Sequence, residues 1–299
     1  MTNADPRARY TSPNGINRDA LPWRLWMKAK KLFWDPADID YSKDMTDWDA
    51  LTPELQMGVA VGARGFMVGE EAVTLDILPL VRAISDEGRL EETIFLTSFV
   101  LEEAKHVDFF RGWFDAVGFD PSTAPQVGGG YQQGGGADIF GGELERVMTR
   151  LDNDRSPEAF LDAGITYNQF IEGVAALAGY KGWSKFFEQV DGAFPGLQEG
   201  LRLIQRDERR HIAYGTYLCR RIIAAHPETW DFVERRWAEL TGPFLERSQA
   251  GGRGGRYIKA LIDRRYQVLE AARHQTVEQV EGVDADELEA TSELASASA

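Results

Sequence analysis

Two short segments of the sequence repeat a pattern of carboxylate and imidazole that suits metal binding. Leu101–His106 reads Leu-Glu-Glu-Ala-Lys-His, and Arg206–His211 reads Arg-Asp-Glu-Arg-Arg-His, so each contains Glu-x-x-His. On a helix, positions i and i+3 lie on one face, and each carboxylate therefore points the same way as its imidazole. Two such helices, with two more carboxylates from neighbouring helices, form the cage of a di-iron or di-manganese four-helix bundle. The alternative is that both motifs are solvated pairs on helix surfaces.

The residues around the two motifs favour a buried site over a solvated surface. Phe95 and Phe99 precede Glu103 by eight and four positions, and Ile204 precedes Glu208 by four. These positions share a helical face with the carboxylates. An ionised carboxylate on an apolar face needs a partner such as a metal ion. We therefore expect both motifs to face the interior.

Two further glutamates complete the set of candidate ligands. Glu172 is the only charged residue from Asn168 to Tyr180, and a lone buried charge is costly unless it is paired or bound to metal. On the preceding long helical segment the choice is Glu70 or Glu71, and we choose Glu70 because it continues an apolar face; the alternative for each is a solvated position. The predicted ligands are Glu70, Glu103, His106, Glu172, Glu208 and His211.

This ligand set favours two metal ions of the iron or manganese type. Four carboxylates and two imidazoles suit hard or borderline ions bridged by carboxylates, and the ligand types fit iron and manganese equally. Four negative charges balance two divalent ions, so the buried site stays near electroneutral. Zinc fits less well, because it prefers fewer ligands in tetrahedral geometry. An open position on such a metal pair can bind and reduce O2.

Long helices must position these residues. Apolar spacing and stop signals predict an all-α fold, a four-helix bundle with additional helices, and Pro79 should bend or end the first bundle helix. Thr52 with Pro53, and Ser156 with Pro157, are typical helix starts. The predicted bundle helices span about residues 54–82, 88–117, 157–190 and 197–225.

The remaining segments complete a single predicted domain over residues 1–282. Residues 1–20 are polar and suggest an arm over the surface, and the bundle occupies about 54–225. Accessory helices are expected at about 22–34 and 228–280. The small, acidic stretch 283–299 is typical of a disordered tail.

Composition limits the partners and the compartment. A net charge of −15 and a pI near 4.8 argue against nucleic acid as the main partner. Cys219 is the only cysteine, so an internal disulfide is excluded and a reducing compartment is favoured. No stretch reaches the roughly 18 apolar residues of a membrane span, and no apolar run near the N-terminus indicates a signal peptide. We expect a cytoplasmic protein.

In these motifs the sequence resembles the ferritin-like superfamily, and within it the small subunit of ribonucleotide reductase. The order Glu, Glu-x-x-His, Glu, Glu-x-x-His on four successive helices supports the resemblance over about residues 54–225. The sequence is most similar to the ligand-binding oxidases related to that subunit. The segments that carry this closer similarity are Val68–Val73, Thr166–Asn168 with Glu172-Gly173, and Asp207–His211.

The resemblance implies a specific cofactor and reaction. It implies a manganese–iron pair, or a di-iron pair, with manganese nearer His106 and iron nearer His211, and with Glu103 and Glu208 as bridges. It also implies activation of O2 and an ether cross-link between the Val73 β-carbon and the Tyr167 oxygen. A long-chain fatty acid or similar apolar ligand would bind through its carboxylate, and the protein would be a homodimer. The expected activity is a lipid-related two-electron oxidation.

Two other functions compete with the oxidase. Reductases that store a tyrosyl radical carry tyrosine four residues after the histidine of the first motif, where this chain has Phe110. A radical-free manganese–iron reductase subunit also carries phenylalanine there, but it needs apolar anchors in its C-terminal peptide, and the tail LEATSELASASA offers few. The third alternative is a non-catalytic ferritin-like protein that binds metal or lipid.

Overall fold

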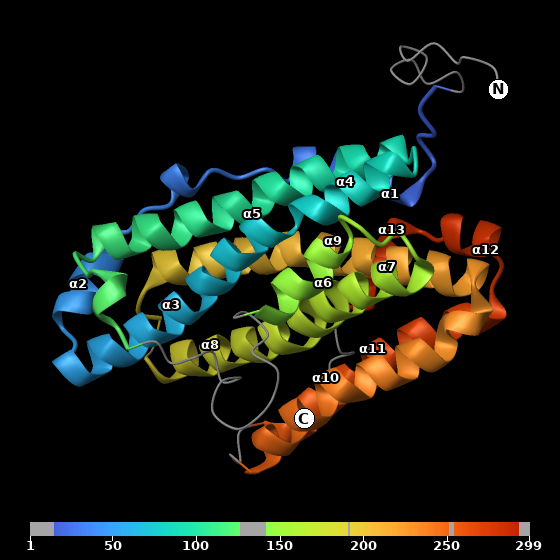
Figure 1. The fold of residues 1–299 in the computed structure, drawn as a ribbon. Helices are drawn as coiled ribbons and strands as arrows, with labels where there is room; N and C mark the ends of the chain where they lie inside the picture. Colours follow the sequence, from blue (N-terminus) through green and yellow to red (C-terminus); the bar gives the residue numbers. More distant parts are fainter. Residues whose placement is uncertain (1–14, 126–141, 191, 251–253, 293–299) are drawn as a thin grey trace.

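The computed structural model describes residues 15–125, 142–190, 192–250 and 254–292, and all regular structure in these ranges is helical (Figure 1). Helix α3 packs along α5, and a third long segment, made of three consecutive helices, packs along α9. The predicted all-α bundle with additional helices is confirmed. Its four segments are α3 (Pro53–Asp76), α5 (Leu90–Ala116), α7 (Pro157–Gly164) with η5 (Ile165–Ala176) and α8 (Leu177–Gln189), and α9 (Pro195–Ala225).

The predicted starts and breaks of the bundle helices are largely correct. Thr52 and Ser156 each accept a hydrogen bond from the backbone N–H three residues on, at 3.4 and 3.3 Å, which satisfies a donor that the first turn leaves free. Pro79 lies in the first turn of α4 (Leu78–Asp86), so the first bundle helix ends just before it. These local signals place the helices that carry the candidate ligands.

The third bundle segment differs from the predicted continuous α-helix. Its middle part, η5, is a π-helix, in which backbone hydrogen bonds join residues i and i+5. It carries Tyr167 and Glu172, and all residues from Ile165 to Val174 are buried. The extent of the helix was predictable, but its hydrogen-bond pattern was not, because the segment is buried on every side and its sequence shows no polar face from which a period could be read.

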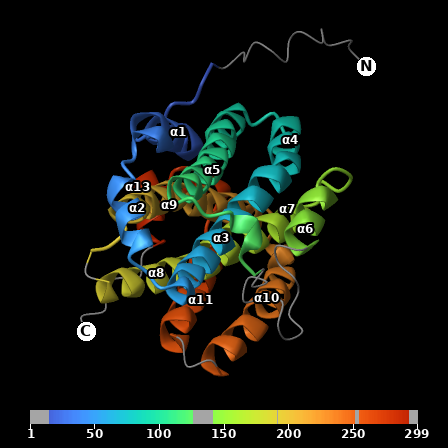
Figure 2. The ribbon, with the colours of Figure 1, turned by 90° about the vertical axis from the view of Figure 1, so that its left-hand side faces the viewer.

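Accessory helices cover the bundle (Figure 2). Helix α1 (Leu21–Lys31) packs along α5, and α10 pairs with α11 on the opposite side of the molecule. Helix α2, which the sequence did not predict, carries the buried Asp44, whose carboxylate accepts the N–H groups of Gly196 and Leu197 at 2.8 Å. It thereby caps α9. Besides α1 and α4, the accessory α-helices up to residue 281 are α2 (Ser42–Asp49), α6 (Leu144–Arg150), α10 (Trp230–Ala250), α11 (Gly255–Glu270) and α12 (Val277–Glu281).

The C-terminal stretch corrects one prediction. Disorder was expected from residue 283, but Ala285–Ala290 form α13, which packs against α9 with Leu288 buried. Asp284 caps this helix, and Arg265 donates to the carbonyl of Thr291. Ala285 and Leu288, three positions apart, and the cap at Asp284 suffice for one short packed helix. The acidic composition of the whole stretch gives no sign of this helix. Residues 293–299 of the predicted tail lie outside the described ranges.

The predicted N-terminal arm is described only from residue 15, and residues 1–14 lie outside the described part. The backbone N–H of Asn17 donates to Glu91 of α5 at 2.7 Å, which holds the end of the arm to the bundle. Across the described ranges, none of the helices combines the length and apolar character needed to cross a membrane.

Candidate metal centre

The six candidate ligands converge inside the bundle. Helices α5 and α9 each supply two of them, and α3 and η5 supply one each. They form two groups, each with ligand atoms within 4.8 Å of one another. All six side chains are buried, and Glu103 and Glu208 belong to both groups. The first group is Glu70, Glu103, His106 and Glu208, and the second is Glu103, Glu172, Glu208 and His211.

The imidazole of His106 faces the first group through Nδ1. This atom lies 3.2 Å from Glu70 Oε2, 3.5 Å from Glu208 Oε1 and 3.8 Å from Glu103 Oε2. Three carboxylates on three different helices therefore surround one ring nitrogen. Glu71, the alternative to Glu70, instead lies at the surface and pairs with Arg111 at 3.2 Å.

The second group contains polar atoms that the protein leaves unsatisfied. His211 Nδ1 lies 2.9 Å from Glu103 Oε1 and 3.6 Å from Glu172 Oε1. Neither His211 Nδ1 nor Glu172 Oε1 makes a hydrogen bond, although both atoms are buried. Leaving such atoms unpaired is costly, and one metal ion between them would satisfy both. The donor atoms therefore fit a bound ion.

The outer nitrogens of the two histidines contact acidic residues in a crossed arrangement. His211 Nε2 lies 2.9 Å from Glu102 Oε2, and His106 Nε2 lies 3.4 Å from Asp207 Oδ2. Each acidic residue comes from the motif helix opposite its histidine. Such contacts fix the ring orientation and leave Nδ1 free to bind metal.

Two cations and an indole hold these outer carboxylates. Arg210 donates to Glu102 at 2.5 Å and to Asp207 at 2.6 Å. Lys105 Nζ and Trp34 Nε1 both donate to Asp207 Oδ2 at 2.7 Å. Two buried carboxylates thus face two buried cations, and this layer adds no net charge to the cage.

Burial and mutual contact shift the pKa values of the cage residues. Burial raises the pKa of Glu172 to about 7, and it raises the pKa of Glu70 and Glu208 as well. For His106 and His211, burial acts to lower the pKa, but the surrounding carboxylates raise it well above its usual value. Without metal the cage therefore holds protons, which binding ions must displace.

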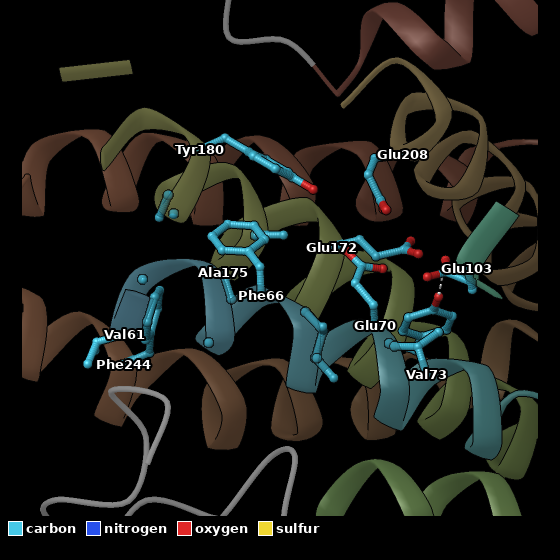
Figure 3. Close-up of a pocket in the computed structure, with 18 residues that line it drawn as sticks. Val61, Phe66, Glu70, Val73, Glu103, Glu172, Ala175, Tyr180, Glu208 and Phe244 are labelled. Atoms are coloured by element: carbon cyan, nitrogen blue, oxygen red, sulfur yellow. Dashed lines mark hydrogen bonds between the residues drawn. The ribbon is translucent and has the colours of Figure 1, made fainter. Parts of the chain in front are cut away.

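An apolar cavity of about 400 Å³ opens on the carboxylates (Figure 3). Figure 3 shows Val61 and Phe244 at one side of the view and Glu103 at the other. A cavity of this size and lining suits a small apolar molecule with one polar end. Besides Glu70, Glu103, Glu172 and Glu208, its walls include Val61, Gly65, Phe66, Val73, Tyr167, Ile171, Ala175, Ala176, Ala178, Tyr180 and Phe244.

Comparison with known proteins gives the family. The family model of the ribonucleotide reductase small chain matches residues 17–240. An R2-like ligand-binding oxidase from Sulfolobus acidocaldarius is 37% identical, with a TM-score of 0.82, and the match covers 94% of this chain and 100% of that one. The chain belongs to the family of R2-like ligand-binding oxidases.

A second solved structure of an R2-like ligand-binding oxidase supports the assignment. It was determined with an aerobically reconstituted Mn/Fe cofactor and is 32% identical to this chain, with a TM-score of 0.72. The match covers 98% of this chain and 94% of that one. The ferritin-like fold and the predicted family are both confirmed.

The two residues of the predicted cross-link lie at the same site. Val73 and Tyr167 both line the cavity, and the Tyr167 hydroxyl donates to Glu103 Oε1 at 2.9 Å, the dashed line in Figure 3. Phe110 is fully buried and packs against Phe66 and Phe109. As a phenylalanine, it offers no phenol at that position.

Sequence reasoning missed the residues around the outer nitrogens of this R2-like oxidase site. Glu102 and Asp207 each lie four positions before a motif histidine, on the same helical stripe, and that spacing could have singled them out. Trp34 carries no such signal, because it reaches Asp207 from a distant segment.

Proposed function

We propose that this chain is an O2-activating oxidase with a dinuclear manganese–iron centre and a long-chain fatty acid or similar apolar ligand. The observation that carries the proposal is the pair of buried four-residue groups that share Glu103 and Glu208 beside an apolar cavity. His106 would face the manganese and His211 the iron, with the two shared carboxylates as bridges. When bound, the metal pair would supply electrons for the reduction of O2.

The charges of the site favour a ligand with an anionic end. The four carboxylates would balance two divalent ions, and ions of higher charge held there would give an excess of positive charge. In a buried site such an excess must be neutralised. A carboxylate head group supplies one negative charge, and its apolar chain fits the cavity that begins at the carboxylates.

Val73 and Tyr167 are the proposed site of an ether cross-link. The Val73 Cβ–H bond and the Tyr167 O–H bond break and a Cβ–O bond forms, which releases two electrons and two protons. O2 accepts these together with two electrons from the metal ions and two protons from solvent, and two waters result. The hydrogen bond to Glu103 directs the phenol oxygen toward the cage before the reaction.

Intact mass spectrometry tests the cross-link. Protein is loaded with manganese and iron without oxygen and measured before and after exposure to air. We expect a loss of two hydrogens, localised to linked peptides that contain Val73 and Tyr167. An unchanged mass in protein with full metal content would contradict the oxidation and would favour a non-catalytic metal or lipid binding protein.

Neighbouring glutamates give a matched test of the cage. We expect Glu70→Gln to lower the metal content and Glu71→Gln to leave it unchanged, because only the first side chain faces the cage. Glu172→Ala should abolish binding of one of the two ions. Metal content is read by mass spectrometry of the elements after gel filtration, and full occupancy in Glu172→Ala would remove that residue from the cage.

An exposed apolar face supports the proposed homodimer. Leu75 and Leu78, three positions apart at the junction of α3 and α4, are 73% and 53% exposed, and Leu101 on α5, which packs against both helices, is 54% exposed. Exposed large apolar side chains on adjoining helices are typical of protein interfaces. A second copy of this chain would cover them.

A further inference from the structure

The cavity contains a second phenol that neither the cage nor the cross-link uses. Tyr180 on α8 is 3% exposed and lines the cavity together with the four cage carboxylates. In Figure 3 its oxygen points toward the side where Glu208 lies. Among the described residues, the one side-chain hydrogen bond at Tyr180 is that of the Ser184 hydroxyl to the Tyr180 carbonyl, at 3.1 Å, and the Tyr180 hydroxyl itself has no protein partner. The hydroxyl is therefore a donor that is accessible from the cavity and unpaired within the protein.

The ring of Tyr180 is held in this position by its neighbours. The rings of Phe66 and Tyr180 pack with their centroids 4.8 Å apart. Phe66 also lies against Gly179, where an added Cβ would come within 2.7 Å of the ring. Only glycine allows this approach of α3 and α8 without displacing Phe66. The direction of the hydroxyl thus follows from the packing of the two helices.

Tyr180 is also the only free neutral donor in the cavity wall. Once metal ions bind the four glutamates and displace their protons, only Tyr167 and Tyr180 among the lining side chains carry an O–H group, since the ordinary pKa of tyrosine is about 10. Tyr167 already donates to Glu103. If the proposed cross-link forms, Tyr167 also loses its proton, and Tyr180 becomes the one phenol donor left.

We propose that Tyr180 donates its hydroxyl to the oxygen-bearing head group of the bound ligand and so selects ligands with an acceptor at the metal end. A bare hydrocarbon in the cavity would cover the Tyr180 hydroxyl and leave it without a hydrogen-bond partner. Sites built to form a hydrogen bond discriminate strongly against ligands that lack the matching group. This inference rests on the proposed function, because it takes the cavity as the ligand site.

The test compares two ligands in Tyr180→Phe, which removes only the hydroxyl. Octanoate and octane are titrated calorimetrically into protein loaded with manganese alone and kept free of oxygen, so that no reaction occurs. We expect octanoate to bind about tenfold to a hundredfold more weakly to the variant, as loss of a hydrogen bond to a charged group predicts. Octane should bind the variant at least as tightly as the unmodified protein.

A matched tyrosine provides the control. Tyr41 is partly buried, its hydroxyl also lacks a partner, and it lies outside the cavity wall. Tyr41→Phe should leave both affinities unchanged. The carboxylate stretching band of bound ¹³C-labelled octanoate should shift in Tyr180→Phe and not in Tyr41→Phe, which a purely structural role of Tyr180 would not produce.

The outcomes separate this inference from the proposed function. Equal octanoate affinity in Tyr180→Phe and in the unmodified protein, at equal metal content, would overturn the role of Tyr180 and leave the oxidase proposal intact. An equal loss of octanoate and octane affinity would likewise overturn head-group selection. Failure of the unmodified protein to bind octanoate would overturn the ligand part of the proposed function, and this inference with it.

Discussion

One of two comparable glycines of α3 allows the cavity to be filled without loss of stability. Gly58 and Gly65 are both exposed, and a Cβ added at either would meet no atom within 4 Å. Only Gly65 borders the cavity. Leucine at either position should stabilise the helix by about 1 kcal/mol, the usual difference between glycine and a good helix former.

The effect of Gly65→Leu on ligand binding follows from the size of the added side chain. Four added carbons would displace about four methylene groups of a fatty acid from the cavity. At about 0.8 kcal/mol for each buried methylene, the loss is about 3 kcal/mol, which weakens binding by roughly a hundredfold. The structure therefore predicts opposite effects on stability and on ligand affinity from one substitution.

The assay measures both quantities in both variants. The midpoint temperature of thermal unfolding should rise by about 2–4 °C in both Gly58→Leu and Gly65→Leu. Calorimetric titration with a long-chain fatty acid should show weaker binding only in Gly65→Leu. Unchanged affinity in Gly65→Leu would mean that the ligand does not occupy this cavity. An equal loss in both variants would point to a change in the whole helix and would also refute the reasoning.

Three further predictions concern other parts of the molecule. Asp207→Asn should destabilise the protein by about 3–5 kcal/mol, measured by denaturant unfolding, because it leaves Lys105 and Arg210 buried with one carboxylate fewer; a loss below 1 kcal/mol would show that the network is dispensable. Burial raises the pKa of the Cys219 thiol to about 12, so at pH 8 a thiol reagent should label the unfolded protein and spare the folded one; rapid labelling of folded protein would contradict this burial. Leu75→Glu should convert the proposed dimer to monomers in sedimentation at unchanged helix content, and an unaltered dimer would place the interface elsewhere.

The cage was predictable because its chemistry leaves a local trace. A Glu-x-x-His motif on an apolar face requires a partner wherever the helix lies, and a lone Glu172 in an uncharged run requires one too. Glu70 could be chosen over Glu71 for the same reason, since only one of two adjacent residues can follow the apolar face.

Other features depend on contacts between distant segments. Trp34 reaches Asp207 across 173 positions of sequence, and nothing near either residue predicts the pair. Helix α13 was hidden because its two buried apolar residues, Ala285 and Leu288, lie in an acidic stretch, and their burial depends on the surface of α9. No local pattern in the sequence singles out Tyr180, and only the structure shows that its hydroxyl faces the cavity.

The π-helix η5 has a consequence for how this fold can change. Tyr167 and Glu172 are five positions apart, and on an α-helix at about 100° per residue they would point about 140° away from each other. Hydrogen bonding from i to i+5 instead sets such residues one above the other. Both side chains therefore line one cavity because of the backbone register rather than because of their own identities. A change of register alone, with no residue replaced, would move the Tyr167 phenol away from Glu172. Such a protein would keep its candidate metal ligands but would have no phenol beside them to oxidise.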